Sequence, residues 1–311
     1  MFVRPVSIDP DVAATAGEAA APQDESGRVE RRHPYSQRTA VLATMHDKGR
    51  LIAPALRTAI GLEVRDVAVD TDQLGTFSGD VARAGTPWET AVAKARLGMH
   101  ATGSRLGLAS EGSIGPPPGF PFGVVTVELV VLVDEELDIV VGESSVGYDL
   151  ITLTANVLPG DDIEALLERG GFPEHGMIVR PAAGPAAPLH KGIHDRKVLD
   201  DAIRECAIAS PDGRAHVETD LRAHHCPSRR PIIAAAAQRL GERLATCCPT
   251  CATPGWGIVR VELGVPCQLC GRAVHVPNAD VYGCVACEVG QTVHRPISDG
   301  ADPGRCQWCN P

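Results

Sequence analysis

Eight of the eleven cysteines of this 311-residue chain fall into four CxxC pairs near its C-terminus. Two residues between cysteines let a tight turn present both thiolates to one ion at about 2.3 Å, and two such turns complete the tetrahedron that Zn²⁺ accepts. The pairs are Cys248/Cys251, Cys267/Cys270, Cys284/Cys287 and Cys306/Cys309. We therefore expect two structural zinc ions, each held by four cysteines.

The spacing leaves two ways of combining the four pairs. Joining the first with the second and the third with the fourth encloses loops of 15 and 18 residues, 252–266 and 288–305. Each loop is long enough for the β-hairpin of a zinc ribbon, which residues 257–265 would supply in the first. We favour this sequential arrangement, and an interleaved cross-brace is the alternative. A rubredoxin-like iron site competes for the same ligands, because sulfur tetrahedra accept either metal.

The cysteine pattern and the lack of a recognisable secretory signal favour a reducing compartment. Cys206, Cys226 and Cys247 stand outside the ligand pattern, and we expect them to be spare or buried thiols. The N-terminal segment lacks the cationic flank and apolar core of a secretory signal, and no apolar run reaches membrane-spanning length. We expect a cytoplasmic protein without disulfides.

The charge of the chain argues against nucleic acid and anionic membranes as partners. The formal net charge is −10 at pH 7, and the segment 248–311 holds four Arg against five Asp and Glu. Because each Zn(Cys)₄ centre adds two negative charges, the module comes out near −5, the wrong sign for a phosphate-neutralising surface. We interpret the module as structural or as the contact for a protein partner.

The segments before the cysteines predict an α/β domain. Residues 1–36 lack helical or strand periodicity and predict a disordered tail. Beyond them, strands alternate with helices, which favours a mixed, partly parallel sheet with flanking helices. Strands are expected at 40–44, 62–69, 106–109, 124–141 as a hairpin, 150–157, 177–180 and 215–219, and helices at 51–61, 86–99, 161–168, 196–207 and 231–245. The expected organisation is a tail (1–36), an α/β domain (37–245) and a double zinc-ribbon module (246–311).

Two further features of these elements bear on chemistry. Thr86, Pro87 and Glu89 have the spacing of a capping box with proline at the first helical position. The segment 110–113 (Ser-Glu-Gly-Ser) predicts a polar turn that ends the strand before it.

The order of these segments resembles the inosine-triphosphatase superfamily, pyrophosphatases that hydrolyse non-standard nucleoside triphosphates. The segment 89–95, Glu-Thr-Ala-Val-Ala-Lys-Ala, resembles the family's Glu-Asn-Ala-x-x-Lys-Ala helix. Segment 44–48 corresponds to its first phosphate turn without the Asn, 110–113 to its acidic turn, 170–173 to its Gly-Phe segment and 222–229 to its Ser-His-Arg turn. The whole chain also resembles a bacterial family of unknown function that joins such a unit to a double zinc ribbon.

The resemblance assigns expected roles to nine residues. Cleavage of a phosphoanhydride needs a divalent ion, carboxylates that hold it and orient water, and cations around the leaving group. The expected catalytic residues are Glu111, Glu89 and Lys94, with Mg²⁺ as cofactor, and the expected substrate-binding residues are Thr44, His46, Lys48, Lys191, Arg222 and His224.

Structural interpretations compete with these roles. Glu89 is explained by the capping box alone, and Lys94 by a solvated helix face. Lys191, Arg222, Arg229 and Arg230 fit ordinary surface charges. The leading hypothesis is a magnesium-dependent hydrolase of nucleotide-like phosphoanhydrides with a structural zinc module. The alternative is a non-catalytic zinc-binding scaffold that recruits a protein partner.

Overall fold

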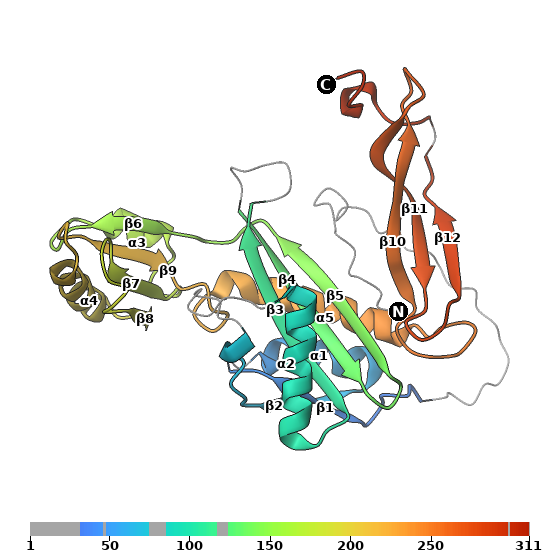
Figure 1. Cartoon of the computed structure of the whole chain (residues 1–311), viewed down its shortest axis with the longest axis horizontal. Helices are drawn as coiled ribbons and strands as arrows, with labels where there is room; N and C mark the ends of the chain where they lie inside the picture. Colours follow the sequence, from blue (N-terminus) through green and yellow to red (C-terminus); the bar gives the residue numbers. More distant parts are fainter. Residues whose placement is uncertain (1–31, 46–47, 75–84, 117–123, 298, 311) are drawn as a thin grey trace.

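The computed structural model describes residues 32–45, 48–74, 85–116, 124–297 and 299–310. Within these ranges the strands form three separate sheets of five, four and three strands (Figure 1). The strands of the first two sheets belong to the α/β part, and the third sheet belongs to the cysteine-rich C-terminus. The mixed α/β fold with a separate C-terminal module confirms the predicted fold class.

The first sheet has the strand order β2-β1-β3-β4-β5. Strand β1 pairs in parallel with β2 and β3, whereas β3, β4 and β5 pair antiparallel. The strands are β1 (Thr39–Ala43), β2 (Glu63–Val67), β3 (Leu106–Gly115), β4 (Val125–Asp134) and β5 (Ile139–Gly147). The sheet is therefore partly parallel, as the alternation of strands and helices predicts.

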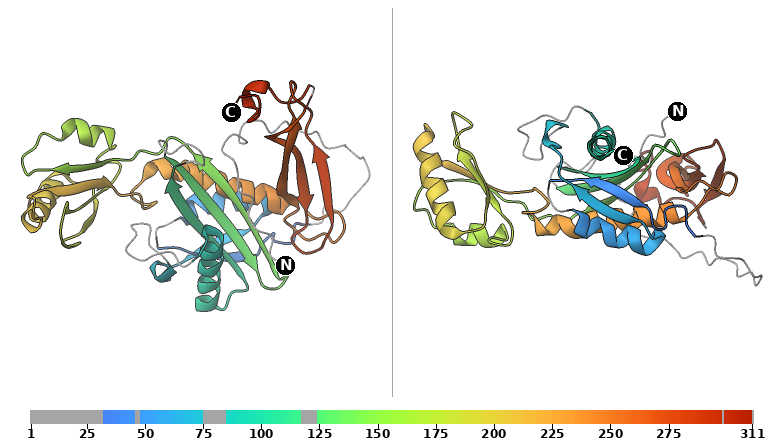
Figure 2. Two further views of the ribbon diagram at one scale, coloured as in Figure 1. Left: turned by 45° about the horizontal axis from the view of Figure 1, so that its top comes forward. Right: turned by 90° about the horizontal axis from the view of Figure 1, so that it is seen from below.

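Helices cover both faces of this sheet. Helix α2 (Pro87–Thr102) packs on one face, and α1 (Gly49–Ile60) with α5 (Arg230–Ala245) packs on the other (Figure 2). Because both faces are covered, strands such as β4 are buried along nearly their whole length. Neighbouring residues of a strand consequently point into different cores, which matters for the charged residues of β3 and β4.

The ends of the first two helices follow their local sequence signals. Thr86 Oγ1 accepts a hydrogen bond from the Glu89 backbone N–H, and Glu89 Oε2 accepts one from the Thr86 N–H, so the predicted capping box is confirmed. Helix α1 ends at Gly61, which adopts the left-handed conformation (φ 67°) that glycine tolerates best.

Strand β3 is longer than the sequence predicts. The expected turn at 110–113 lies inside the strand, which continues to Gly115 and pairs residue for residue with β4. The prediction of a turn was wrong because the ten-residue apolar partner β4 offers backbone hydrogen bonds along its full length, and this pairing overrides the turn preference of Ser and Gly.

The second sheet has its own core, so the predicted single unit 37–245 contains two packed bodies. Its order is β6-β9-β7-β8, and every pairing is antiparallel. The elements are β6 (Thr154–Val157), α3 (Glu164–Arg169), β7 (Met177–Pro181), β8 (His190–Ile193), α4 (Arg196–Ala209) and β9 (Ala215–Thr219). The body lies to one side of the first sheet in Figure 1, and the short helix η3 (Pro227–Arg229) follows it before α5.

The C-terminal module is built on a three-stranded antiparallel sheet. Strands β10 (Gly257–Pro266) and β11 (Ala273–Gly283) form a long hairpin, and β12 (Gly290–His294) pairs with β11. Residues 257–265 therefore form one strand and not the hairpin that we expected, because their partner is β11 and not a strand inside the same loop. Figure 1 shows this hairpin extending away from the first sheet.

The folded part begins before residue 37. Residues 1–31 lie outside the described residues, but Tyr35 is fully buried and the His33 ring lies 2.9 Å from the Leu244 carbonyl oxygen of α5. The last residues of the predicted tail are therefore packed on the α/β domain. Among the described residues, no helix is both long and apolar enough to cross a membrane.

Candidate functional site

Two lysines from different elements reach neighbouring residues of β3. Lys94 of α2 donates to Glu111 Oε2 at 2.7 Å, and the two side chains are only 12% and 7% exposed. Lys48, just before α1, donates to Ser110 Oγ at 2.8 Å. Since adjacent strand residues point to opposite faces, the Lys94–Glu111 pair lies under α2 and the Lys48–Ser110 pair under α1 and α5.

A buried ion pair adjoins Lys48 on the second of these faces. Arg229 Nε and Nη2 donate to the two carboxylate oxygens of Glu128 at 2.6 and 3.0 Å, and Arg229 Nη1 donates to the Leu221 carbonyl oxygen at 2.5 Å. The side chains of Glu128 and Arg229 are 0% and 2% exposed. The expectation of Arg229 as a surface charge was therefore wrong, because Glu128 of β4 supplies a matching bidentate partner.

Sequence reasoning missed Glu128 altogether. The available signal was a single Glu within the apolar strand Val-Thr-Val-Glu-Leu-Val-Val-Leu-Val. A carboxylate in a strand that is covered on both faces needs a cation beside it, and Arg229 is the cation that the fold brings there. We refer below to Lys48, Lys94, Glu111, Glu128 and Arg229 as the charged cluster.

The surroundings of Lys48 disfavour its positive charge. Burial, followed by the nearby positive charge of Arg229, lowers the pKa of Lys48 to about 8, although Glu128 and Glu111 act in the opposite direction. Within the described part of the chain no carboxylate lies within ion-pair distance of its ammonium group, and its hydrogen bond goes to a neutral hydroxyl. A lysine in such surroundings suits an incoming anion.

The location of the cluster follows from the sheet topology. Strand β1 pairs with β3 only as far as Leu108, so Ser110 and Glu111 lie beyond the carboxyl end of β1. Thr44 is the first residue after β1; it is buried, and its N–H donates to the Val67 carbonyl oxygen. The carboxyl ends of parallel strands are where open α/β sheets usually bind ligands.

The eight cysteines of the four pairs form two groups of four. Within each group, the four sulfur atoms lie within 4.8 Å of one another. The first group is Cys248, Cys251, Cys284 and Cys287, and the second is Cys267, Cys270, Cys306 and Cys309. Sulfur contacts between pairs run from 3.5 to 3.9 Å. Four converging thiols are the ligand set of a structural zinc or a rubredoxin-like iron site, so each group could hold one metal ion.

The grouping is interleaved, and the favoured sequential pairing was wrong. The reason is the β10–β11 hairpin. An antiparallel hairpin brings the start of β10 beside the end of β11, so the first CxxC pair meets the third. The second pair lies in the turn at the opposite end of the hairpin, where the C-terminal segment returns with the fourth pair (Figure 1).

The first group of cysteines is continuous with the α/β part. Val285 packs against the core of the first sheet. Arg243 of α5 donates to Glu143 of β5 at 2.7 Å and to the Gly255 carbonyl oxygen at 3.2 Å. A Cβ atom at Gly255 (φ 104°) would come within 2.8 Å of Val141, so this approach requires glycine. We call this group the proximal centre and the group at Cys267 the distal centre.

Residues 94–311 match the family described as "Domain of unknown function (DUF6671)". The match covers more than half of the chain. The chain belongs to this family. No curated protein matches the chain. The DUF6671 region includes Lys94, Glu111, Glu128, Arg229 and all eight clustered cysteines, whereas Lys48 precedes it. The family description states no activity.

Several residues that the sequence predicted as site residues lie elsewhere in the DUF6671 protein. Glu89 is exposed and closes the capping box with Thr86, at the start of α2 and more than one helical turn from Lys94. Its described hydrogen bonds go to Thr86. His46 lies outside the described residues.

The remaining three predicted substrate residues belong to the second sheet and its exit. Lys191 lies on β8. Arg222 forms an ion pair with the buried Asp220 at 2.5 Å. Burial alone would raise the pKa of Asp220, but the hydrogen bonds and charge of Arg222 hold that pKa below its usual value. The ring of His224 contacts that of His225, with centroids 3.9 Å apart and the ring planes tilted by 48°. None of the three has a described contact with the charged cluster.

Proposed function

We propose that the charged cluster binds the phosphate groups of a nucleotide-like ligand and hydrolyses a phosphoanhydride bond in it, while the cysteine module holds two structural zinc ions. The observation that carries this proposal is that Lys48 and Lys94, from separate elements, reach the adjacent residues Ser110 and Glu111 beyond the end of a parallel strand, where Lys94 and Glu111 lie near enough to act on the charge of Lys48. The resemblance to nucleotide pyrophosphatases rests on the same residues, in the same order.

The chemistry asks for cations that neutralise phosphate oxygens and for a group that orients and deprotonates water. Lys94 and Glu111 satisfy each other in the absence of ligand. A phosphate can compete for the Lys94 ammonium group, and Glu111 then becomes the base that accepts a proton from water. Lys48 supplies a second cation whose only described partner is a hydroxyl.

The arrangement of donors does not by itself make a magnesium site. Glu111 is held by Lys94, Glu128 by Arg229, and Glu89 closes a helix cap. Among the described residues the only groups of three or more metal-ligating side chains are the two cysteine groups. In the described part of the chain, the cluster therefore presents cations and one water-orienting carboxylate, Glu111, and the assay below measures the effect of Mg²⁺.

The test is the release of pyrophosphate or phosphate from standard and deaminated nucleoside triphosphates, with and without Mg²⁺. We expect Glu111→Gln to reduce turnover by about 100-fold or more, because the amide keeps the shape but cannot accept a proton. The control is Glu168→Gln, an exposed carboxylate of α3, which should leave turnover unchanged. Equal activity of the wild type and the Glu111 variant would refute the assignment.

The pairing of every carboxylate in the charged cluster with a cation favours a second candidate, a non-catalytic scaffold that binds a nucleotide-like ligand and recruits a protein partner through the cysteine module. Saturable binding of a triphosphate without any release of phosphate or pyrophosphate, at any Mg²⁺ concentration, would select this candidate over the hydrolase.

A further inference from the structure

A cavity of about 560 Å³ lies on the second sheet, apart from the charged cluster. Its lining includes Ile178 and Arg180 of β7, Leu189 and Lys191 at β8, Glu218 of β9 and the loop 182–186. This volume lies within the range of small-molecule sites in proteins. Mixed apolar and charged lining is also typical of such sites.

The strand periodicity decides which side chains reach the cavity. Met177 and Val179 of β7 lie in the core beneath α4, so Ile178 and Arg180, which alternate with them, project from the opposite face. On β9, Val217 lies in the same core and Glu218 projects with Arg180. The cavity is therefore on the face of the sheet that α4 does not cover.

A β-bulge brings Lys191 onto this face. Met177 pairs with Ile193 and Val179 with His190, so two residues of β8 oppose the single residue Ile178. One of the two is Gly192, whose φ of 69° is the left-handed conformation typical of such bulges. His190 contacts Glu205 of α4 at 3.1 Å and so lies on the covered face. Without the bulge, strict alternation from Ile193 would put Lys191 on that face too.

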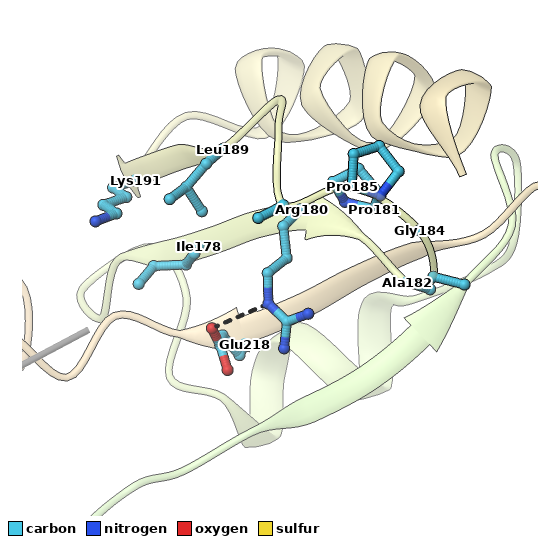
Figure 3. A pocket seen from close by; sticks show the side chains of 11 residues that line it. Ile178, Arg180, Pro181, Ala182, Gly184, Pro185, Leu189, Lys191 and Glu218 are labelled. Carbon is cyan, nitrogen blue, oxygen red and sulfur yellow. Dashed lines mark ion pairs between the residues drawn. The ribbon is translucent and has the colours of Figure 1, made fainter. Parts of the chain in front are cut away.

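The ion pair between Arg180 and Glu218 in the cavity is long and exposed. Arg180 Nε lies 3.8 Å from Glu218 Oε1, and the two side chains are 41% and 36% exposed. An exposed pair at this distance contributes little to stability, so a phosphate or carboxylate can displace Glu218 from the guanidinium group and bind it through two hydrogen bonds. Figure 3 shows the side chains of Ile178 and Leu189 between those of Lys191 and Arg180.

We propose that this face is a second binding site, for a small anion that carries an apolar group next to its phosphate or carboxylate. Arg180 binds the anionic end in place of Glu218, Ile178 with Leu189 contacts the apolar end, and Lys191, on the far side of these two side chains, adds positive charge to the site. The site does not depend on the hydrolase proposal, because none of its side chains belongs to the charged cluster.

The experiment is a calorimetric titration of the full-length protein with phenyl phosphate, a phosphate monoester with an apolar ring. The Lys48→Met background is used throughout, so that the charged cluster does not contribute a second phosphate site. We expect saturable binding, weakened about tenfold or more by Arg180→Gln with Lys191→Met. The matched control is Arg169→Gln with Lys197→Met, which removes the same charge from exposed helix positions of the same body and should leave the affinity unchanged.

A further variant tests the apolar end. Leu189→Ala should weaken phenyl phosphate severalfold and leave the affinity for inorganic phosphate unchanged, because it removes apolar contact and no charge. Absence of saturable binding, or equal affinity in the Arg180/Lys191 variant and its control, would overturn the proposal. An equal effect of Leu189→Ala on both ligands would also contradict it, since the apolar group would then make no contact.

Discussion

The proximal centre and the charged cluster both place polar groups in the interior, but with opposite expected effects on stability. Four thiols converge at the proximal centre, and a metal bound there would join α5, β5 and the β10–β11 hairpin into one body. At the charged cluster, the half-buried Lys48 donates to a hydroxyl, beside a guanidinium group that disfavours its charge and two carboxylates that partly offset this effect. Metal binding to converging thiolates adds folding free energy, whereas a desolvated cation whose charge is only partly compensated subtracts from it. Under the proposed function, the cysteines stabilise the fold and Lys48 binds a ligand.

The largest expected effect is at the proximal centre. Cys248→Ser should release one metal ion and lower the free energy of unfolding of the α/β part by roughly 3 kcal/mol or more, because the lost metal no longer joins the hairpin to α5. Metal analysis and thermal unfolding measure the two effects. Wild-type protein should contain two zinc ions.

The distal centre provides the matched control for that experiment. Cys267→Ser should also release one ion but leave unfolding of the α/β part unchanged, since its partners Cys306 and Cys309 lie at the far end of the hairpin. Equal loss of stability in the two variants would erase the difference between the centres. Loss of both ions from either one would contradict two independent sites.

At the charged cluster a substitution should raise the free energy of unfolding, the opposite of the effect at the cysteines. Lys48→Met should increase the free energy of unfolding by on the order of 1 kcal/mol, because a neutral side chain of similar length removes the cost of burying the charge. Chemical denaturation of the two proteins measures this difference. A destabilised variant would show that Lys48 serves the fold, and the contrast with the cysteines would be lost.

The pH dependence of that gain follows from the pKa of Lys48. Its folded-state pKa of about 8 lies below the ordinary value of 10.5, so the folded state binds fewer protons than the unfolded chain between these values. The penalty is complete below pH 8 and decreases as the pH rises toward 10.5. The stability advantage of Lys48→Met should therefore be constant from pH 6 to about 7 and smaller at about pH 9. A constant difference across this range would contradict a lowered pKa.

The smallest effect is expected at Glu89. Glu89→Ala should cost about 0.5–1 kcal/mol, the contribution of one side of a capping box, and leave ligand affinity unchanged. Chemical denaturation and calorimetry measure the two quantities. A large loss of affinity would return Glu89 to the site, where the family resemblance had placed it.

Local signals in the sequence predicted ligands and helix ends but not the contacts between distant segments. The CxxC spacing identifies all eight thiols that the structure brings together, because two thiolates of one site come from one turn. Which two CxxC pairs share one site depends on the β10–β11 hairpin. The sequence of a single CxxC pair does not encode that hairpin. The capping box of α2 was predictable for the same local reason.

The charged cluster shows the limit of such signals. Ser110 and Glu111 looked like a turn, and only their pairing with β4 makes them strand residues. Arg229 looked like a surface cation, and only the packing of α5 on the first sheet brings it to Glu128, 101 positions earlier in the chain. Charges that depend on such long-range contacts cannot be placed from spacing.

The most direct test of the charged cluster as a ligand site is the affinity for a deaminated nucleoside triphosphate at pH 7, measured by calorimetry for wild type and Lys48→Met. We predict binding to the wild type that is at least about tenfold weaker in the variant, because a buried cation that donates to a phosphate contributes well over 1 kcal/mol. Equal affinity of the two proteins, or no binding to either, would contradict the account.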